Sequence, residues 1–398
     1  MSTVWKSVKR NKLKEGGFYI NIHQASPLEL KDSGFDGKFY DINRALTPSI
    51  RMTISSTNTP AVQADDEWSP LKAVIVGRAG RACFPAAHPE MIKATMPTEH
   101  VHRFIPKNPF PKDIIEKAEA ELDFLAAILK AEGVRVYRPL SGIDWIAEGG
   151  YTGAMPRDGL ISVGNTLIEA PFAWSCRSRE IKLAYSQMLR QLAEEDENAR
   201  IVYRSAETFA DTLINEPQDE KDQWVINNSR PAFDAADFMR FGSTIIGQYS
   251  HVTNQAGVEY LRSHLPVGYH VEMLNVNDPH AMHIDATILP LREGLLVYHP
   301  YKVTEDALRA HKVLANWNLV PFPFIPQAPE WPPLYMTSAW LPLNALVLDG
   351  ERVIVEASDE RTIKFYGELG MKCIKCPFKH VNSIGGSFHC ATVDLVRG

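Results

Sequence analysis

The chain has 398 residues, 45% of them hydrophobic and 23% charged, which is typical of a globular protein with a large core. Its net charge of −6 argues against nucleic acid or an anionic membrane as the main partner, because both demand a basic face. Five scattered cysteines do not form a disulfide framework, so a reducing compartment is expected.

The N-terminal segment is basic and then polar. Lysines and arginines precede the first acidic residue, Glu15, and no apolar stretch of a secretory signal is present. Residues 51–66 are rich in Ser, Thr, Asn and Pro, as a linker would be. We expect residues 1–62 to form an arm and linker in a cytoplasmic protein, with organellar targeting as the alternative.

From about residue 68, the chain repeats one layout of strand, turn, strand, helix and strand. We expect the copies at these positions: strand 71–76, an insertion, helix 112–132 and strand 134–137; strands 160–163 and 166–169, a helix through 181–192 and strand 200–203; strand 243–248, a helix from about 254 and strand 270–274; strands 286–291 and 295–298, a helix capped by Thr304 and strand 319–322; strands 345–348 and 352–356, a helix capped by Ser358 and strand 371–376.

Five copies of one unit favour a closed ring, because a single unit cannot cover its own apolar face. The sequence therefore predicts an α/β propeller of five small sheets, with helices outside and the first strands around a central channel. A doubly wound sheet is the alternative. It would call for a glycine-rich nucleotide loop, and neither G-x-G-x-x-G nor G-x-x-x-x-G-K occurs in the chain.

Polar residues stand next to the repeated units at comparable places. Equivalent points of units in a ring face a common axis, so residues far apart in sequence are expected to meet at one mouth. The residues are Asp158 before the second unit, Asp234 and Asp237 before the third, His283 and Asp285 before the fourth, Thr337 and Ser338 before the fifth, and Cys390 after it.

The carboxylates of Asp158, Asp234 and Asp285 would share a small, partly dry space. Two like charges 4 Å apart cost roughly 4 kcal/mol at an effective dielectric near 20, so such a cluster must protonate, bind a metal or await a cation. Zinc prefers several Cys and His ligands at short spacing, which the chain lacks. A planar guanidinium fits better, because its N–H groups pair with carboxylates two at a time.

Cys390 is then placed to attack the electrophilic carbon of that guanidinium. A nearby cation lowers the pKa of a thiol, so the substrate would help to ionise its own attacker. His283 can exchange protons with the departing and incoming amines, and Asp234 or Asp285 can fix its tautomer. Each of these residues alone is more often structural; their shared position in the repeat favours the functional interpretation.

Two other features have structural interpretations. The pair Cys373 and Cys376 has redox or zinc spacing, but it lies on a closing strand with no second pair. The proline-rich stretch 321–335 is a candidate peptide ligand, although a rigid loop beside the mouth is the preferred interpretation.

At these residues the sequence resembles the amidinotransferases, and the resemblance runs from about Trp68 to the C-terminus. That family has a five-bladed α/β propeller fold, called pentein, so the resemblance implies an amidinotransferase domain at residues 63–398. The matching stretches are AMPRDGLISVGNTLIEAP at 154–171, FDAADFMRFG at 233–242, SHVTN at 250–254, MHIDAT at 282–287 and GGSFHCATVD at 385–394.

The resemblance implies roles for individual residues. Cys390 matches the nucleophile that carries the amidino group, and His283 matches the general acid/base with Asp234 as its carboxylate partner. The remaining matches are contacts to the substrate: Asp158 and Asp285 for the guanidinium, Thr337 and Ser338 as a hydroxyl pair, and Met282 as part of the pocket wall.

Two positions depart from the family pattern. Lys302 stands where glycine amidinotransferase has an arginine for the donor carboxylate, and a lysine lacks the bidentate fork of arginine. Residues 228–231 read Asn-Ser-Arg-Pro, where the family typically has an acid before the proline. Both changes concern the choice of substrates rather than the chemistry.

The resemblance implies ping-pong transfer of the amidino group from L-arginine to an amine, with ornithine released and no cofactor or metal required. Glycine or another small amino acid is the first expected acceptor, and an amine of specialised metabolism is the second. A hydrolase of the same fold and a non-catalytic binder of guanidino compounds remain alternatives. The expected partners are small molecules, without nucleic acid or membrane, and a homodimer is left open.

Overall fold

The structure is a computed structural model that describes residues 59–86, 89–96, 100–205 and 224–398. Apart from its last four residues, the predicted arm 1–62 lies outside the described residues. Among the described residues, none of the helices has the length and apolar character needed to cross a membrane. The cytoplasmic location stays a prediction.

Five three-stranded sheets form the described part of the chain. In four of them two consecutive strands pair antiparallel, and a third returns parallel after a helical connection, as the repeat predicted. The sheets are β15-β1-β2 (Thr392–Arg397, Leu71–Val76, Arg135–Tyr137), β3-β4-β5 (Leu160–Val163, Thr166–Glu169, Arg200–Val202), β6-β7-β8 (Phe238–Phe241, Thr244–Gln248, His270–Leu274), β9-β10-β11 (Ile288–Arg292, Leu295–Tyr298, Asn318–Pro321) and β12-β13-β14 (Leu346–Asp349, Arg352–Glu356, Lys372–Cys376).

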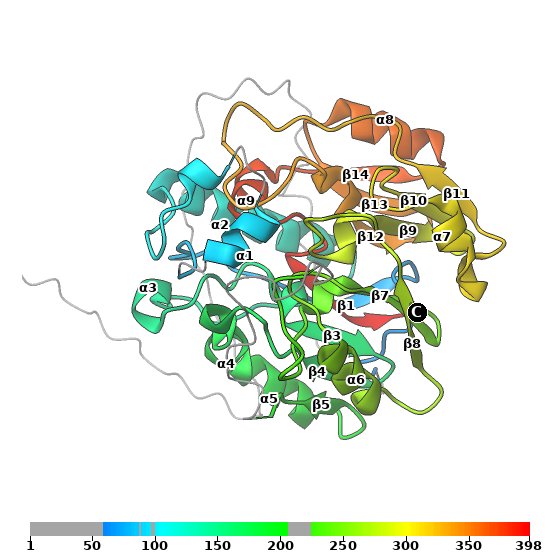
Figure 1. The fold of residues 1–398 in the computed structure, drawn as a ribbon, viewed down its shortest axis with the longest axis horizontal. Coiled ribbons are helices and arrows are strands. Elements are labelled where there is room, and N and C mark those ends of the chain that lie inside the picture. The colour runs from blue at the N-terminus through cyan, green and yellow to red at the C-terminus, as the bar shows by residue number, and fades with distance from the viewer. Residues whose placement is uncertain (1–58, 87–88, 97–99, 206–223) are drawn as a thin grey trace, which may run out of the picture. The chain divides into compact units, whose positions relative to one another are not determined.

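Helices connect the strands and lie toward the periphery, with α2, α5, α6 and α8 on the outer side of the sheets (Figure 1). The α-helices of the described residues are α1 (Pro89–Thr95), α2 (Lys112–Ala131), α3 (Trp145–Glu148), α4 (Glu180–Ala184), α5 (Ser186–Glu195), α6 (Gln255–His264), α7 (Glu305–Arg309), α8 (Glu360–Glu368) and α9 (Lys379–Ile384).

Two expected helices differ in detail. The helix expected through 181–192 is split into α4 and α5, because the carbonyl of Ala184 accepts the N–H of Leu140 from another segment. The cap of α8 is Asp359, whose carboxylate accepts the N–H of Thr362, rather than Ser358. Thr304 caps α7 as expected.

Five hydrophobic clusters join the sheets into a closed ring. Each cluster fills the space between two neighbouring sheets, and the last lies between the fifth sheet and the first. The clusters join β1 and β15 to β3 and β4, β3 and β4 to β6 and β7, β6 and β7 to β9 and β10, β9 and β10 to β12 and β13, and β12 and β13 to β1. The predicted five-bladed α/β propeller is thereby confirmed.

The first sheet differs from the expected layout, because its inner strand comes from the C-terminus. β15 pairs antiparallel with β1, from Leu71 opposite Arg397 to Val76 opposite Thr392. The expectation that strand 71–76 faces the centre was therefore wrong. The two ends of the domain close the ring together, and β1 has a strand partner on each side.

Ion pairs fill the centre of the ring where a channel was expected. Arg240 on β6 donates to Glu67 at 2.7 Å and to Asp394 on β15 at 2.5 Å. Arg157 and Arg397 also contact Asp394, at 3.0 and 2.8 Å, and all five side chains are buried. Each charge has at least one partner of opposite sign, which a buried charge requires.

A short 3₁₀ turn precedes the inner strand of four sheets, and neighbouring turns contact one another around the mouth of the ring. This common placement confirms that polar residues far apart in sequence share one end of the propeller. The turns are η3 (Pro156–Asp158), η6 (Ala235–Asp237), η7 (Ile284–Ala286) and η9 (Leu341–Leu343).

The central ion pairs generate a stability prediction. Arg240→Met leaves Glu67 and Asp394 buried with one cation fewer, and removing one member of a buried pair costs about 3–5 kcal/mol. The midpoint of urea unfolding should therefore fall clearly. Lys364→Met, which removes an exposed pair with Glu368 on α8, is the matched control and should leave the midpoint nearly unchanged. Equal midpoints for the two variants would contradict the structural role of the central network.

Candidate active site

A cavity of about 310 Å³ opens at the end of the ring where the turns gather. Its wall contains seven of the nine predicted site residues: Met282, His283, Asp285, Lys302, Thr337, Ser338 and Cys390. The other two, Asp158 and Asp234, are buried against His283, whose Nδ1 lies 3.7 Å from Asp158 Oδ1 and whose Nε2 lies 3.0 Å from Asp234 Oδ2. The structure thus brings all nine residues to one place.

Local backbone geometry fixes the cysteine and the histidine. His283 precedes turn η7 with a φ of 65°, which a non-glycine residue adopts only when its surroundings hold it there. Cys390 follows the pair Gly385-Gly386, and a Cβ on Gly386 would lie 2.7 Å from the Cβ of Cys390. The second glycine is therefore required for the close approach of the chain to the thiol.

The sulfur of Cys390 is buried, with 5% of the residue exposed, and has two polar partners. Asn344 Nδ2 donates to Sγ at 3.1 Å, and the thiol donates to Asp285 Oδ2 at 3.3 Å. Asn344 Oδ1 also accepts the N–H groups of Ser387 and Cys390, so this amide holds the whole loop. Burial, followed by the charge of Asp285, raises the pKa of the Cys390 thiol to about 12. The surroundings of Cys390 therefore favour the neutral thiol.

The surroundings of His283 favour its protonated form. Burial opposes its charge, but the carboxylates of Asp158 and Asp234 raise the pKa of His283 well above its ordinary value. An imidazolium with one face toward the cavity is a proton donor for a leaving amine. The arrangement of Cys390, His283 and Asp234 is therefore a nucleophile, an acid/base and a carboxylate that orients it.

The buried carboxylate oxygens without a hydrogen-bond partner among the described residues include Oδ1 of Asp158, Asp234 and Asp285. The second oxygen of each group is occupied, by Arg177 for Asp158, by His283 for Asp234 and by His389 for Asp285. Asp285 Oδ2 lies 3.3 Å from the sulfur of Cys390, and an oxygen of Asp158 lies within 4.8 Å of it. A buried acceptor without a donor is costly, so unpartnered oxygens on two carboxylates beside the thiol indicate a site for a ligand with several N–H groups.

The outer wall of the cavity carries a pair of opposite charges. Lys302 Nζ lies 2.8 Å from Asp278 Oδ2, and both residues line the cavity. Nearby, the rings of His299 and Trp340 pack against each other with centroids 3.6 Å apart and planes tilted by 32°. Burial lowers the pKa of His299 to about 3, so this histidine is neutral. The wall thus offers one cation and one anion to a zwitterionic group, beside a flat apolar surface.

A metal would compete for the same atoms. Asp158, His283 and Cys390 each present one ligand atom, and these three atoms lie within 4.8 Å of one another. Three ligands of this kind suffice for a catalytic zinc ion. Against this interpretation, the carboxylates of Asp158 and Asp234 raise the pKa of His283 well above its ordinary value, so a metal would have to displace that proton.

Sequence reasoning missed four residues that complete the site: Arg177, Asp278, Asn344 and His389. Asn344 could have been found, because it stands two residues before β12, just as Asp158 stands two residues before β3. Alignment of the copies on their inner strands would have selected Asn344 rather than Thr337 and Ser338. Arg177, Asp278 and His389 carry no such signal.

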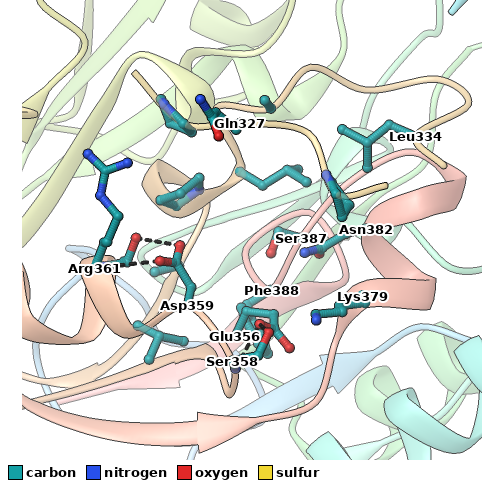
Figure 2. Close-up of a pocket in the computed structure, with 18 of the residues that line it drawn as sticks. Gln327, Leu334, Glu356, Ser358, Asp359, Arg361, Lys379, Asn382, Ser387 and Phe388 are labelled. Carbon is teal, nitrogen blue, oxygen red and sulfur yellow. Dashed lines mark hydrogen bonds between the residues drawn. The ribbon is translucent and has the colours of Figure 1, made fainter. Parts of the chain in front are cut away.

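A second cavity of about 310 Å³ lies on the other side of the loop that carries Cys390, and Figure 2 shows its lining. Ser387 and Phe388 contribute to its wall, and Leu341 borders both cavities. The proline-rich loop supplies Pro326, Pro329 and Leu334 to this second cavity, whereas the catalytic cavity is lined by residues that follow the loop. None of the nine predicted site residues lines the second cavity.

Cys373 and Cys376 are free thiols on β14 that line neither cavity, and their pKa values are raised by burial. A raised thiol pKa is typical of an unreactive structural cysteine.

No protein-family model matches the chain. Curated proteins do match it. An L-arginine:L-lysine amidinotransferase of Pseudomonas savastanoi pv. phaseolicola is 39% identical over 353 residues, which cover 85% of this chain and 95% of the relative. The mitochondrial glycine amidinotransferase of Danio rerio is 37% identical over 84% of this chain and 83% of its own length.

A solved structure agrees with these relatives. SxtG, an amidinotransferase of saxitoxin biosynthesis from Microseira wollei, superposes with a TM-score of 0.75 at 34% identity, over 85% of this chain and 98% of its own. Both kinds of similarity span the propeller and the cysteine, histidine and carboxylates gathered at its mouth. This chain belongs to the amidinotransferase family.

Proposed function

We propose that this amidinotransferase takes the amidino group from L-arginine, holds it on Cys390 and passes it to the amino group of an acceptor amino acid. The observation that carries the proposal is the pair of unpartnered oxygens, Asp158 Oδ1 and Asp285 Oδ1, on the two carboxylates that lie beside Sγ. A guanidinium supplies five N–H donors in a planar fork, enough to bond both oxygens, and its positive charge suits both carboxylates.

In the first half-reaction, the guanidinium binds on Asp158 and Asp285, and its charge favours ionisation of the buried thiol, whose proton is released to solvent. The thiolate of Cys390 forms a C–S bond to the guanidinium carbon, which gives a neutral tetrahedral species. The imidazolium of His283 then protonates the nitrogen that carries the ornithine chain. The C–N bond breaks with its electron pair on that nitrogen, and ornithine leaves a positively charged amidino group on sulfur.

In the second half-reaction, a neutral acceptor amine attacks the amidino carbon, and the now neutral His283 takes one proton from it. The C–S bond breaks with its electron pair on sulfur, which restores the thiolate and releases a guanidinium product. From the thiolate onward, each proton transfer involves His283 and each covalent change involves Cys390, so the proposed cycle requires no metal or cofactor.

Lys302 and Asp278 are the proposed site for the head group of the amino-acid substrates. The ammonium of Lys302 can bind a carboxylate, and Asp278 can bind an α-ammonium. Glycine is the first acceptor to test. Met282 lines the cavity, and methionine is the residue type found at this position in glycine amidinotransferase. L-Lysine is the second, since a relative at 39% identity is named for it. An amine of specialised metabolism is the third.

The covalent step can be observed without an acceptor. Enzyme incubated with arginine alone and a chelator should release ornithine and gain about 42 Da on the peptide that contains Cys390, as expected for an amidino adduct. Cys390→Ala should do neither, and Cys376→Ala is the matched control that should behave like the wild type. Citrulline in place of a lasting adduct would show a hydrolase, and activity that depends on an added metal would contradict the proposed mechanism.

The isolated adduct then identifies the acceptor. Glycine, L-lysine and a panel of other amines are added one at a time, and mass spectrometry follows the loss of about 42 Da from the enzyme and its gain by the amine. A true acceptor discharges the adduct faster than buffer does. Failure of every amino acid, together with discharge by an amine that lacks a carboxylate, would overturn the proposed acceptor class.

Lys302→Met should raise the arginine concentration that gives half-maximal adduct formation by about 10- to 100-fold, the usual worth of a hydrogen bond to a charged group. Agmatine, which is arginine without its carboxylate, should react equally with the variant and the wild type. Lys302→Arg is the control that preserves the charge and should retain most of the affinity. An equal effect on arginine and agmatine would show that Lys302 does not bind the carboxylate.

The thiol of the empty enzyme should react slowly at neutral pH. Because burial raises the pKa of Cys390 to about 12, the rate of its alkylation by iodoacetamide should rise about tenfold per pH unit from about pH 6 to about pH 9, without a plateau. Asp285→Asn removes a neighbouring negative charge and should therefore accelerate alkylation at each pH. A plateau near neutral pH, read from the mass of the Cys390 peptide, would instead show a thiolate paired with His283.

A further inference from the structure

His389 lies directly before the nucleophile in sequence, but its side chain points away from the cavity and into the core. Its two ring nitrogens both face carboxylates: Nδ1 lies 2.8 Å from Asp285 Oδ2, and Nε2 lies 3.4 Å from Glu67 Oε2. Only 4% of the residue is exposed. The imidazole is therefore a bridge between the proposed guanidinium site and the ion pairs at the centre of the propeller.

The contacts determine the charge of this histidine. An ionised carboxylate only accepts hydrogen bonds, so a nitrogen that faces one must carry a proton. Glu67 is held ionised by Arg240, which donates to both of its oxygens. Both nitrogens of His389 then carry protons, and the ring is an imidazolium. Burial and the neighbouring Arg157 oppose this charge, while Asp285 and Glu67 favour it, and the net effect is a raised pKa for His389.

Asp285 has a specific need for such a cation. It is buried and adjoins the thiol of Cys390, and burial alone would raise the pKa of its carboxyl. The hydrogen bond and charge of His389 outweigh that effect and lower the pKa of Asp285. The hydrogen bond from His389 also occupies Oδ2 of Asp285. Among the described residues, Oδ1 of Asp285 has no hydrogen-bond partner, so it is the oxygen left for a ligand.

Asp158 shows the same arrangement on the opposite side of the site. Its Oδ2 accepts from Arg177 at 2.9 Å, and its Oδ1 has no hydrogen-bond partner in the described part of the chain. Arg177 is in turn fixed by Glu180 and by the rings of Tyr151 and Phe172. Each proposed guanidinium ligand thus has one oxygen bonded to a buried side chain that can carry positive charge and one oxygen without a hydrogen-bond partner, although Asp158 Oδ1 also lies 3.7 Å from His283 Nδ1. Arg177 is permanently charged, whereas His389 can lose its charge.

We propose that His389 is a positioning residue for amidino transfer: as an imidazolium fixed between Glu67 and Asp285, it keeps Asp285 ionised and aims its free oxygen at the guanidinium of arginine. The inference rests on the proposed role of Asp285 as a guanidinium ligand. His389 itself touches neither substrate nor the reacting atoms in this scheme.

The charge of His389 gives the proposal a pH signature. A carboxyl whose pKa is held low is ionised above that pKa, and its function is lost as the pH falls through it. His389→Gln keeps an N–H donor toward Asp285 but removes the positive charge. That charge then no longer opposes the effect of burial on the pKa of Asp285. The pKa of Asp285 should then rise, and arginine binding should fail at a higher pH than in the wild type.

The test measures adduct formation with arginine alone across the range from about pH 5 to about pH 9. In His389→Gln, the pH at which the second-order rate of adduct formation falls on the acidic side should rise by about one unit or more. The rate should be about tenfold or more below that of the wild type at the lowest pH values, and less reduced at the highest. The adduct of about 42 Da should still form. A rate lowered equally at every pH, or a profile like that of the wild type, would overturn the proposal.

A matched control separates this effect from the loss of any buried histidine. His311 is buried and lies 2.7 Å from Glu272 on β8, in a pair of the same kind away from the cavity lining. His311→Gln should leave the acidic limb of the profile in place. A shift of similar size in His311→Gln would show a general loss of stability and would count against His389.

A measurement on the unaltered side chain covers the case in which His389→Gln does not fold. Nuclear magnetic resonance of protein labelled with ¹⁵N-histidine should show an imidazolium that persists at pH values where an exposed histidine, with a pKa of about 6.5, is neutral. The signal should remain in His283→Asn, which removes the other buried imidazolium of the site. Absence of the imidazolium signal from the His283→Asn protein would overturn the proposal. Failure of the proposed function would appear separately, as the absence of any adduct in the wild type.

Discussion

The pairing of β15 with β1 is the constraint on which the rest of the structure depends. It joins the last strand of the chain to the first strand of the propeller and completes a ring of five sheets. Without it, the cluster between the first and second sheets would lose Val393 and Leu395 from its core. Cys390 stands two residues before β15, so the interaction that closes the fold also places the nucleophile at the mouth of the ring.

The ion pairs at the centre connect this closure to the chemistry. Asp394 on β15 and Glu67 share Arg240, and Glu67 also faces His389, which binds Asp285 beside the thiol. A continuous set of buried charges therefore runs from the axis of the propeller to the cavity. Such networks are rarely efficient sources of stability, but they hold polar groups in one geometry. The proposed binding of a planar cation requires polar groups that are held in a fixed geometry.

The electrostatics of the site favour a neutral thiol and a protonated imidazole. Burial and the charge of Asp285 raise the pKa of the Cys390 thiol, while the carboxylates of Asp158 and Asp234 raise the pKa of His283. In the proposed cycle, a cationic substrate supplies hydrogen bonds and counter-charge to the unpartnered oxygens of Asp158 and Asp285. Binding of that cation would also favour the thiolate, so the nucleophile would form when the substrate is present.

The sequence by itself determined the repeat, the sheet class and the residues that reach the mouth. These follow from local information: strand alternation, turn residues and polar side chains just before each inner strand, as with Asp158, His283 and Asp285. Family resemblance supplied their roles. The tertiary structure alone decided that β15 completes the first sheet, that ion pairs rather than a channel fill the centre, and that Arg177, Asn344 and His389 hold the reacting groups. Those contacts join residues as far apart as His389 and Asp285, 104 positions in sequence. No local pattern encodes such a partner, because a buried arginine, asparagine or histidine is recognised only by the groups that the fold brings to it.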